Sequence, residues 1–161
     1  MRILVAAVGR LKHGPERQLA DRYSERAAKA ARRLGWRGID VVEVEESRSR
    51  RPADRLRDEA ARLSAVVPEN AVIVVLDGRG EVVSSQALAD RLRRWQEQGA
   101  APVVAFVIGG PDGLEENFRR RLDLRLAFGT ATWPHQLVRI MLLEQLYRAV
   151  TILGGHPYHR A

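Results

Sequence analysis

The sequence has no cysteine among its 161 residues. This absence excludes disulfides, thiolate nucleophiles and cysteine metal sites together. Long apolar runs are also missing, since runs such as residues 71–76 and 103–108 have only the length of strands, far below the roughly 20 residues of a membrane-spanning helix. The N-terminus shows neither the apolar run nor the small-residue cleavage site of a secretory signal. We therefore expect a cytoplasmic protein that does not enter a membrane.

Several motifs of catalytic chemistry are absent. The histidines are His13, His135, His156 and His159, and no carboxylate stands at metal-binding spacing from any of them. We find no Gly-x-Ser-x-Gly nucleophile elbow, no Gly-x-x-x-x-Gly-Lys-Ser/Thr phosphate loop and no Gly-x-Gly-x-x-Gly dinucleotide fingerprint. We therefore expect no metal cofactor, and the sequence gives little support to acyl transfer by serine or to an ATP-driven reaction.

Lysine is rare, because Lys12 and Lys29 are the only two. Arginine therefore carries most of the formal net charge of +7. Residues 1–66 contain 16 basic and 10 acidic residues (+6), against 11 and 10 (+1) in residues 67–161. Arginine suits bidentate contacts with phosphate, so this distribution favours an anionic partner. A GC-rich genome would also replace lysine by arginine, so the ratio of the two residues does not decide between these accounts.

Short apolar runs alternate with amphipathic stretches along the chain. The pattern predicts strands at residues 3–8, 39–44, 71–77 and 103–108, with a weaker one at 124–128. Helices are predicted at residues 15–34, from Pro52 onward, from Ser84 or Ser85 to Gly99, at 115–121 and at 135–153. This alternation predicts one α/β domain over residues 1–161, with a mostly parallel sheet and helices on both faces.

Glycines follow two of the predicted strands. Gly78 and Gly80 come just after Asp77, and residues 109–113 contain three glycines directly after Ile108. Parallel sheets bind ligands at the carboxyl ends of their strands, and glycines let the backbone approach a ligand closely. These loops are therefore the first candidates for a ligand site. The spacing of residues 109–113 fits a tight turn with positive φ equally well.

Two further segments suggest contacts with other molecules. Residues 45–51 are predicted to be a mobile loop, whose Arg48, Arg50 and Arg51 could reach RNA phosphates, although a solvated connection fits equally well. The helix at 135–153 is apolar nearly all round, which is typical of burial on more than one side. We favour a symmetric dimer over a monomer with a central helix.

Four motifs stand in order in the second half of the chain: VIGGPDGL at 107–114, TWPHQLVR at 132–139, EQLYRA at 144–149 and HPYHR at 156–160. With the opening residues 3–9 they resemble the RlmH family, SPOUT-class methyltransferases that modify a pseudouridine in 23S ribosomal RNA. The resemblance covers the whole chain. It implies a SPOUT-type fold with a C-terminal trefoil knot, a homodimer and S-adenosylmethionine as cofactor. The cofactor-binding residues that it implies are Leu76, Gly110, Gly129, Thr130, Ala131, Thr132, Trp133 and Pro134.

The reaction implied by the resemblance is methyl transfer to N3 of a pseudouridine in the helix 69 loop of 23S RNA, within the assembled ribosome. The tail residues Tyr158, His159 and Arg160 of a partner subunit would position the base and its phosphate. His135 or His159 is the candidate base, with proton loss to solvent as the alternative. Two other hypotheses are a SPOUT-like protein that binds ribosomal RNA without catalysis and a nucleotide-binding α/β enzyme unconnected with RNA.

Overall fold

The computed structural model describes residues 1–99 and 102–159. Among these residues, strands form a single parallel sheet in the order β2-β1-β4-β3-β5. The strands are β1 (Arg2–Val8), β2 (Gly38–Val44), β3 (Val72–Val82), β4 (Val103–Ile108) and β5 (Leu124–Ala127). The helices are α1 (Pro15–Ala31), followed by the 3-10 turn η1 (Arg32–Leu34), then α2 (Pro52–Val66), α3 (Ser85–Glu97), α4 (Glu116–Arg120) and α5 (His135–Leu153).

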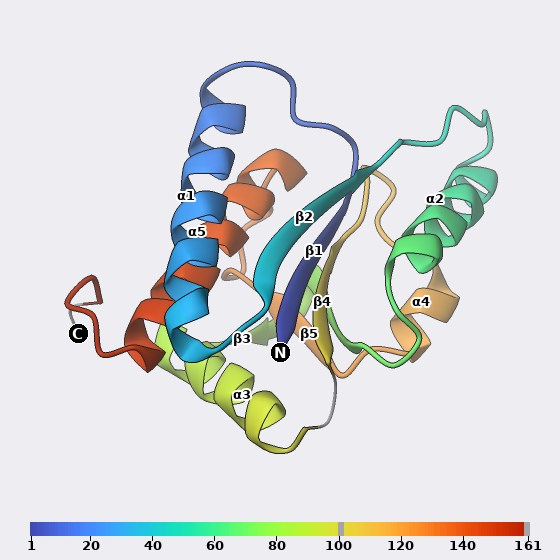
Figure 1. Ribbon diagram of the computed structural model, residues 1–161. Coiled ribbons are helices and arrows are strands. Elements are labelled where there is room, and N and C mark those ends of the chain that lie inside the picture. Colours follow the sequence, from blue (N-terminus) through green and yellow to red (C-terminus); the bar gives the residue numbers. More distant parts are fainter. Residues whose placement is uncertain (100–101, 160–161) are drawn as a thin grey trace.

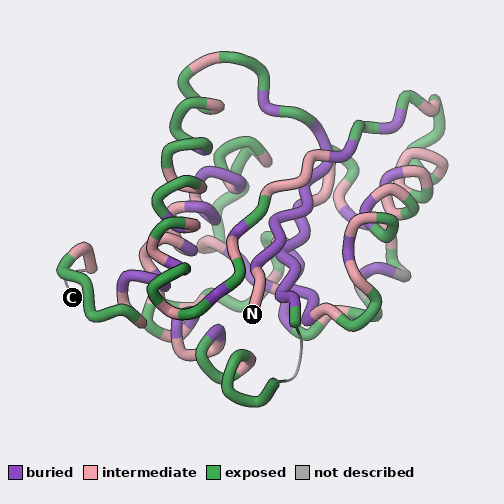
Figure 2. The backbone as a smooth tube through the Cα atoms, viewed as in Figure 1, coloured by how far each residue is buried: buried purple, intermediate pink, exposed green. Residues whose placement is uncertain are grey.

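Helices cover both faces of the sheet (Figure 1). Helices α1, α3 and α5 lie on one face, while α2 and α4 lie on the other. Alternate side chains of β1 supply the two cores, because Ile3 and Val5 join the first while Leu4 and Ala6 join the second with Leu63 of α2. Strand β4 and residues 3–8 of β1 are buried along their length, while β3 is buried only in its first half (Figure 2). The predicted α/β fold is confirmed, and the trefoil knot stays a prediction.

The helix boundaries follow the signals in the sequence. Pro15 and Pro52 begin their helices, and the Ser84 hydroxyl caps α3 by accepting a hydrogen bond from the Ala87 amide at 3.1 Å. Gly35 ends the first helical segment in the left-handed region, at a φ of 72°. These predicted ends are therefore confirmed.

Strand β3 is longer than its apolar run predicts. Gly78 and Gly80, expected in a loop, lie within the strand, which continues to Val82. A Cβ at Gly80 would lie 2.7 Å from the carbonyl carbon of Leu126, so a glycine is needed where β3 and β5 approach. The pairing with β5 shifts register between Leu76 and Glu81. Apolar pattern alone could not show this extension, because residues 77–81 contain no apolar side chain.

A buried guanidinium holds α5 against the sheet. Arg139 is 1% exposed, and its Nη2 donates to the carbonyls of Val8 and Gly9 at 3.3 and 2.9 Å. Its Nη1 lies 3.2 Å from Glu43 Oε1, and Arg17 of α1 contacts the same carboxylate at 2.7 Å. Burial lowers the pKa of Arg139, and the charge of Glu43 opposes that shift. Glu43 of β2 thus joins that strand to α5 through Arg139 and to α1 through Arg17.

The tail after α5 folds back onto that helix. The Tyr158 hydroxyl donates to Glu144 Oε1 at 3.2 Å, and its ring centroid lies 4.5 Å from that of Tyr147. The Arg148 guanidinium lies 5.0 Å from the Tyr158 ring centroid. Burial, followed by contacts with Tyr23 and Glu144, raises the pKa of Tyr158 to about 12. The described part of the tail is therefore docked on its own chain, and its placement at a partner's cavity stays a prediction.

The apolar surface of α5 is covered largely within the chain. Helices α1 and α3 flank it, and residues such as Leu142, Leu143 and Leu146 are buried. Leu137 at its start remains 40% exposed, and Leu19 on α1 is 36% exposed. The all-round apolar character that favoured a dimer is thus mostly accounted for by packing inside one chain, and the dimer stays a prediction.

Replacing Glu43 by Gln should destabilise the fold by about 3 kcal/mol, because it leaves the buried charge of Arg139 without its partner. Asp40→Asn is a matched control on the same strand, since Asp40 is half-exposed and pairs with Arg2 at 2.6 Å. Such an exposed pair contributes less than about 1 kcal/mol. Urea unfolding of both variants measures the difference, and equal losses would contradict the assignment.

Tyr158→Phe tests the buried phenol. Because folding raises the pKa of Tyr158 from 10.0 to about 12, the native protein keeps a proton that the unfolded chain loses earlier. This contribution to stability is fully present below pH 10.0 and is lost as the pH rises toward 12. Titration of tyrosinate absorbance should show a late component that the variant lacks. Superimposable curves for the two proteins would show the assignment to be wrong.

Candidate functional site

A cavity of about 380 Å³ opens at the carboxyl ends of β4 and β5, beside the middle of β3. Residues 76–78 of β3, where the apolar run of that strand ends, and the glycine-rich loop after Ile108 meet here. The start of α5 closes another side, through His135 and Val138. The cavity is lined by residues 76–78, 108–111, 113, 114, 126–129, 131–133, 135 and 138. This position is the one at which open parallel sheets bind small ligands.

Most residues that the resemblance implies in cofactor binding meet in this cavity. Those that line it are Leu76, Gly110, Gly129, Ala131, Thr132 and Trp133. Thr130 and Pro134 belong to the same exposed segment but are not among its lining residues, and Pro134 instead precedes α5 as its N-cap residue. The indole of Trp133 is 42% exposed, and its Nε1 donates to the Phe128 carbonyl at 3.1 Å.

The glycine loop, residues 109–113, is both a tight turn and a cavity wall. The Gly113 amide donates to the Gly110 carbonyl at 2.9 Å, and Gly113 has a φ of 87°. Gly109 has an ordinary φ, but a Cβ there would lie 2.4 Å from the Gly113 oxygen. A side chain at Gly109 would therefore force the loop apart. The two interpretations of this loop, turn and ligand loop, are compatible.

The candidate catalytic residues are not all brought together within one chain. His135 lines the cavity, whereas Tyr158 and His159 do not. Tyr158 contacts Glu144, nine residues and about 14 Å along α5 from His135. Arg160 lies outside the described residues. The tail can therefore contribute to a cavity of this kind only in a second copy of the chain or after leaving its own α5.

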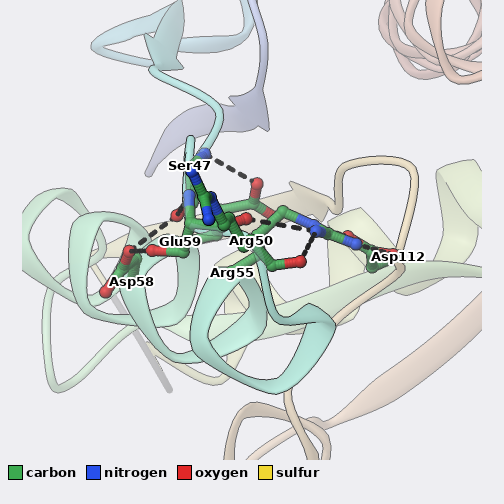
Figure 3. Close-up of polar contacts among 7 residues, drawn as sticks. Ser47, Arg50, Arg55, Asp58, Glu59 and Asp112 are labelled. Carbon is green, nitrogen blue, oxygen red and sulfur yellow. Dashed lines mark hydrogen bonds and ion pairs between the residues drawn. The ribbon is translucent and has the colours of Figure 1, made fainter.

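Loop 45–51 is attached to α2 by hydrogen bonds that the sequence did not reveal. The Ser47 amide donates to Glu59 Oε1 at 3.0 Å, and the hydroxyls of Ser47 and Ser49 donate to Asp58 Oδ2 at 2.6 and 2.9 Å (Figure 3). The two serine hydroxyls lower the pKa of Asp58. The expectation of a mobile loop overlooked these bonds, because a serine in a charged segment gives no sign of its distant partner.

Sequence reasoning also missed Arg55 and Asp112. Arg55 on α2 donates from Nε and Nη2 to the two carboxylate oxygens of Asp112, at 2.6 and 3.1 Å. This hydrogen-bonded pair raises the pKa of Arg55 and lowers the pKa of Asp112, so both groups stay charged at neutral pH. The Asp112 carboxylate belongs to the glycine loop, and no short-range spacing in the sequence connects it with Arg55.

The described residues contain no group of three or more His, Asp or Glu side chains that could hold a metal ion. Within residues 1–99 and 102–159, no helix is long and apolar enough to cross a membrane.

Known proteins resemble this chain in structure and in sequence. The SpoU methyltransferase AviRb from Streptomyces viridochromogenes, solved in complex with AdoMet, has a TM-score of 0.42 and 13% identity over 96% of this chain and 61% of that chain. The chain is 55% identical over 161 residues to the ribosomal RNA large subunit methyltransferase H of Bradyrhizobium sp. (strain ORS 278), covering 100% of this chain and 99% of that protein. It is 57% identical over 160 residues to the protein of that name from Nitrobacter winogradskyi, covering 99% of each.

A family model described as "Predicted SPOUT methyltransferase" matches residues 1–159. The match includes the sheet, the cavity and the described tail. Together with the full-length relatives, it shows that the chain belongs to the SPOUT methyltransferases, in the family of the ribosomal RNA large subunit methyltransferases H.

Proposed function

We propose that this protein transfers a methyl group from S-adenosylmethionine to N3 of a pseudouridine in the helix 69 loop of 23S ribosomal RNA, on the assembled ribosome. The observation that carries the proposal is the cavity at the ends of β4 and β5, whose wall includes residues of two RlmH motifs, 107–114 and 132–139. The names of the relatives support large-subunit ribosomal RNA as the substrate class. A ribosomal substrate places the protein in the cytoplasm.

The cavity fits a cofactor of this size and chemistry. Its volume of about 380 Å³ falls in the range of small-molecule sites, about 300–1,000 Å³. Leu76, Leu114 and Val138 offer apolar wall, while the glycine loop presents backbone groups without intervening side chains. S-adenosylmethionine supplies an activated methyl group on a sulfonium. The chain itself therefore has to bind the cofactor, orient the acceptor nitrogen and let its proton leave.

Two tasks remain for the protein's own residues. The acceptor nitrogen must lie in line with the donated methyl group, and its proton must leave as the new bond forms. His135 lines the cavity at the start of α5 and is the residue best placed to accept that proton. A tyrosine hydroxyl keeps its proton at neutral pH, so we assign Tyr158 to positioning the base rather than to accepting a proton.

We place Tyr158, His159 and Arg160 of one subunit at the cavity of its partner in a homodimer. The separation of Tyr158 from the cavity in one chain supports this arrangement, since the docked tail does not reach the cavity of its own chain. The exposed Arg48, Arg50 and Arg51 would contact RNA phosphates. Loops are the parts of RNA whose unstacked bases a protein can read, which suits a target in a helix loop.

Methyl transfer to ribosomes tests the function directly. Tritiated methyl from S-adenosylmethionine should label intact ribosomes more than stripped 23S RNA, and mass spectrometry should place the label at N3 of a helix 69 pseudouridine. Label elsewhere in the RNA would move the target. Cofactor binding without label on any RNA would favour a nucleotide-binding enzyme unconnected with RNA. RNA binding without cofactor binding would favour a non-catalytic SPOUT-like protein.

Mixing of two inactive variants tests how the subunits share the site. His135→Gln and the double variant Tyr158→Ala, His159→Ala should each lower the single-turnover rate by about 100-fold. After the two are unfolded and refolded together, half of the dimers are mixed, and one of their two sites is intact, giving about a quarter of wild-type activity. No recovery would contradict the shared site. A wild-type rate for His135→Gln would move proton acceptance to solvent or to His159.

A further inference from the structure

One guanidinium joins loop 45–51 to the glycine loop. Arg55 Nη1 donates to the carbonyls of Ser49 and Arg50 at 3.1 and 3.0 Å, while Nε and Nη2 hold Asp112 (Figure 3). The side chains of Arg55 and Asp112 are 27% and 28% exposed. Because the guanidinium is planar and rigid, binding a carboxylate on one edge and two carbonyls on another fixes the position of Asp112 relative to loop 45–51.

Asp112 occupies the part of the glycine loop that faces α2 rather than the cavity. Its neighbours Pro111 and Gly113 line the cavity, as does Gly110, whereas Asp112 does not. The turn is closed by the hydrogen bond from the Gly113 amide to the Gly110 carbonyl. A displacement of the Asp112 carboxylate therefore moves the segment that forms one wall of the cavity.

Glu59 provides a second connection between the same two loops. Its Oε1 accepts the Ser47 amide, and its Oε2 is buried without a hydrogen bond in the described structure. A Cβ on Gly110 would lie 3.0 Å from that second oxygen, so the carboxylate packs directly behind the glycine loop. Helix α2 thus contacts loop 45–51 and the glycine loop at two points, Arg55 and Glu59.

We propose that Arg55 is a positioning residue that couples RNA contact at loop 45–51 to the shape of the cofactor cavity. The RNA half of this inference rests on the proposed function. Phosphates held by the exposed Arg48, Arg50 and Arg51 fix the loop backbone, including the two carbonyls that Arg55 binds. Arg55 in turn fixes Asp112 and the glycine loop, so RNA and cofactor each bind more tightly in the presence of the other.

The coupling is reciprocal by thermodynamic necessity. If RNA raises the affinity for cofactor by a given factor, cofactor raises the affinity for RNA by the same factor. A residue that only stabilises the cavity would change cofactor affinity equally with and without RNA. The ratio of the two affinities therefore separates coupling from a merely structural role.

The test measures the dissociation constant of tritiated S-adenosylhomocysteine by equilibrium dialysis, with and without saturating ribosomes. This probe carries no methyl group to transfer, so no turnover disturbs the equilibrium. Wild-type protein should bind it about five-fold more tightly with ribosomes, near the lower end of typical couplings. Arg55→Gln, which breaks both halves of the connection, should bring the ratio close to one. Asp112→Asn should do the same while leaving the contacts of Arg55 with Ser49 and Arg50 in place.

Arg57→Gln is the matched control, because Arg57 lies on the same helix, is 71% exposed in its side chain, pairs with Asp54 one turn away and makes no hydrogen bond to either loop among the described residues. It removes the same charge and should retain the wild-type ratio. Arg55→Lys keeps the positive charge but lacks the several N–H donors of a guanidinium. It should give a ratio of the dissociation constants without and with ribosomes that is below that of wild type. The double variant Arg55→Gln, Asp112→Asn should be no worse than either single variant, since both act through one contact.

Two results would overturn the coupling: a wild-type ratio of one, or a full ratio in Arg55→Gln. Either can occur while ribosomes are methylated, which would leave the proposed function intact. Conversely, a ratio above one without methylation of any ribosomal RNA would contradict the proposed function while still supporting the coupling. Thermal unfolding of each variant identifies any loss of fold, and Asp112→Asn then carries the test without changing helix α2.

Discussion

The position of α5 depends on a buried charge. Arg139 reaches across the core to the carbonyls that follow β1, and Glu43 on β2 neutralises it. Four residues earlier on the same helix, His135 lines the cavity. Residues four apart lie on one face of a helix, so the contact that fixes Arg139 also fixes the direction in which His135 is presented. An apolar residue at 139 could pack in the core, but it could not bind the two carbonyls that tie the helix start to the end of β1.

Much of this architecture could be predicted from the sequence because its signals are local. Apolar runs, the prolines at helix starts and the Ser84 cap act over a few residues, and the structure confirms them. The continuation of β3 depends instead on a close approach to β5 at Gly80, a contact between distant parts of the chain. The contact between Arg139 and Glu43 could not be predicted either, because a charged residue within an apolar helix gives no indication of which carboxylate it will face.

At the candidate site, too, local sequence signals were predictive and contacts between distant residues were not. Strand-end glycines indicated where a ligand would bind, and the RlmH motifs added residues 129–134, most of which line the cavity. The link from Arg55 to Asp112 spans 57 positions and could not be read from spacing. The tail was expected at a cavity, yet Tyr158 lies on Glu144 of its own helix. A single sequence does not say which copy of a chain a docked segment belongs to.

The way loop 45–51 is attached has a consequence for how the family can diverge. Its shape is held by the Ser47 amide, two serine hydroxyls and two main-chain carbonyls, while the guanidiniums at positions 48, 50 and 51 take part in none of these bonds. Those side chains can therefore change between arginine and lysine without altering the path of the backbone. The charge that the loop presents to solvent and the bonds that fix its fold thus reside on different atoms of the same seven residues.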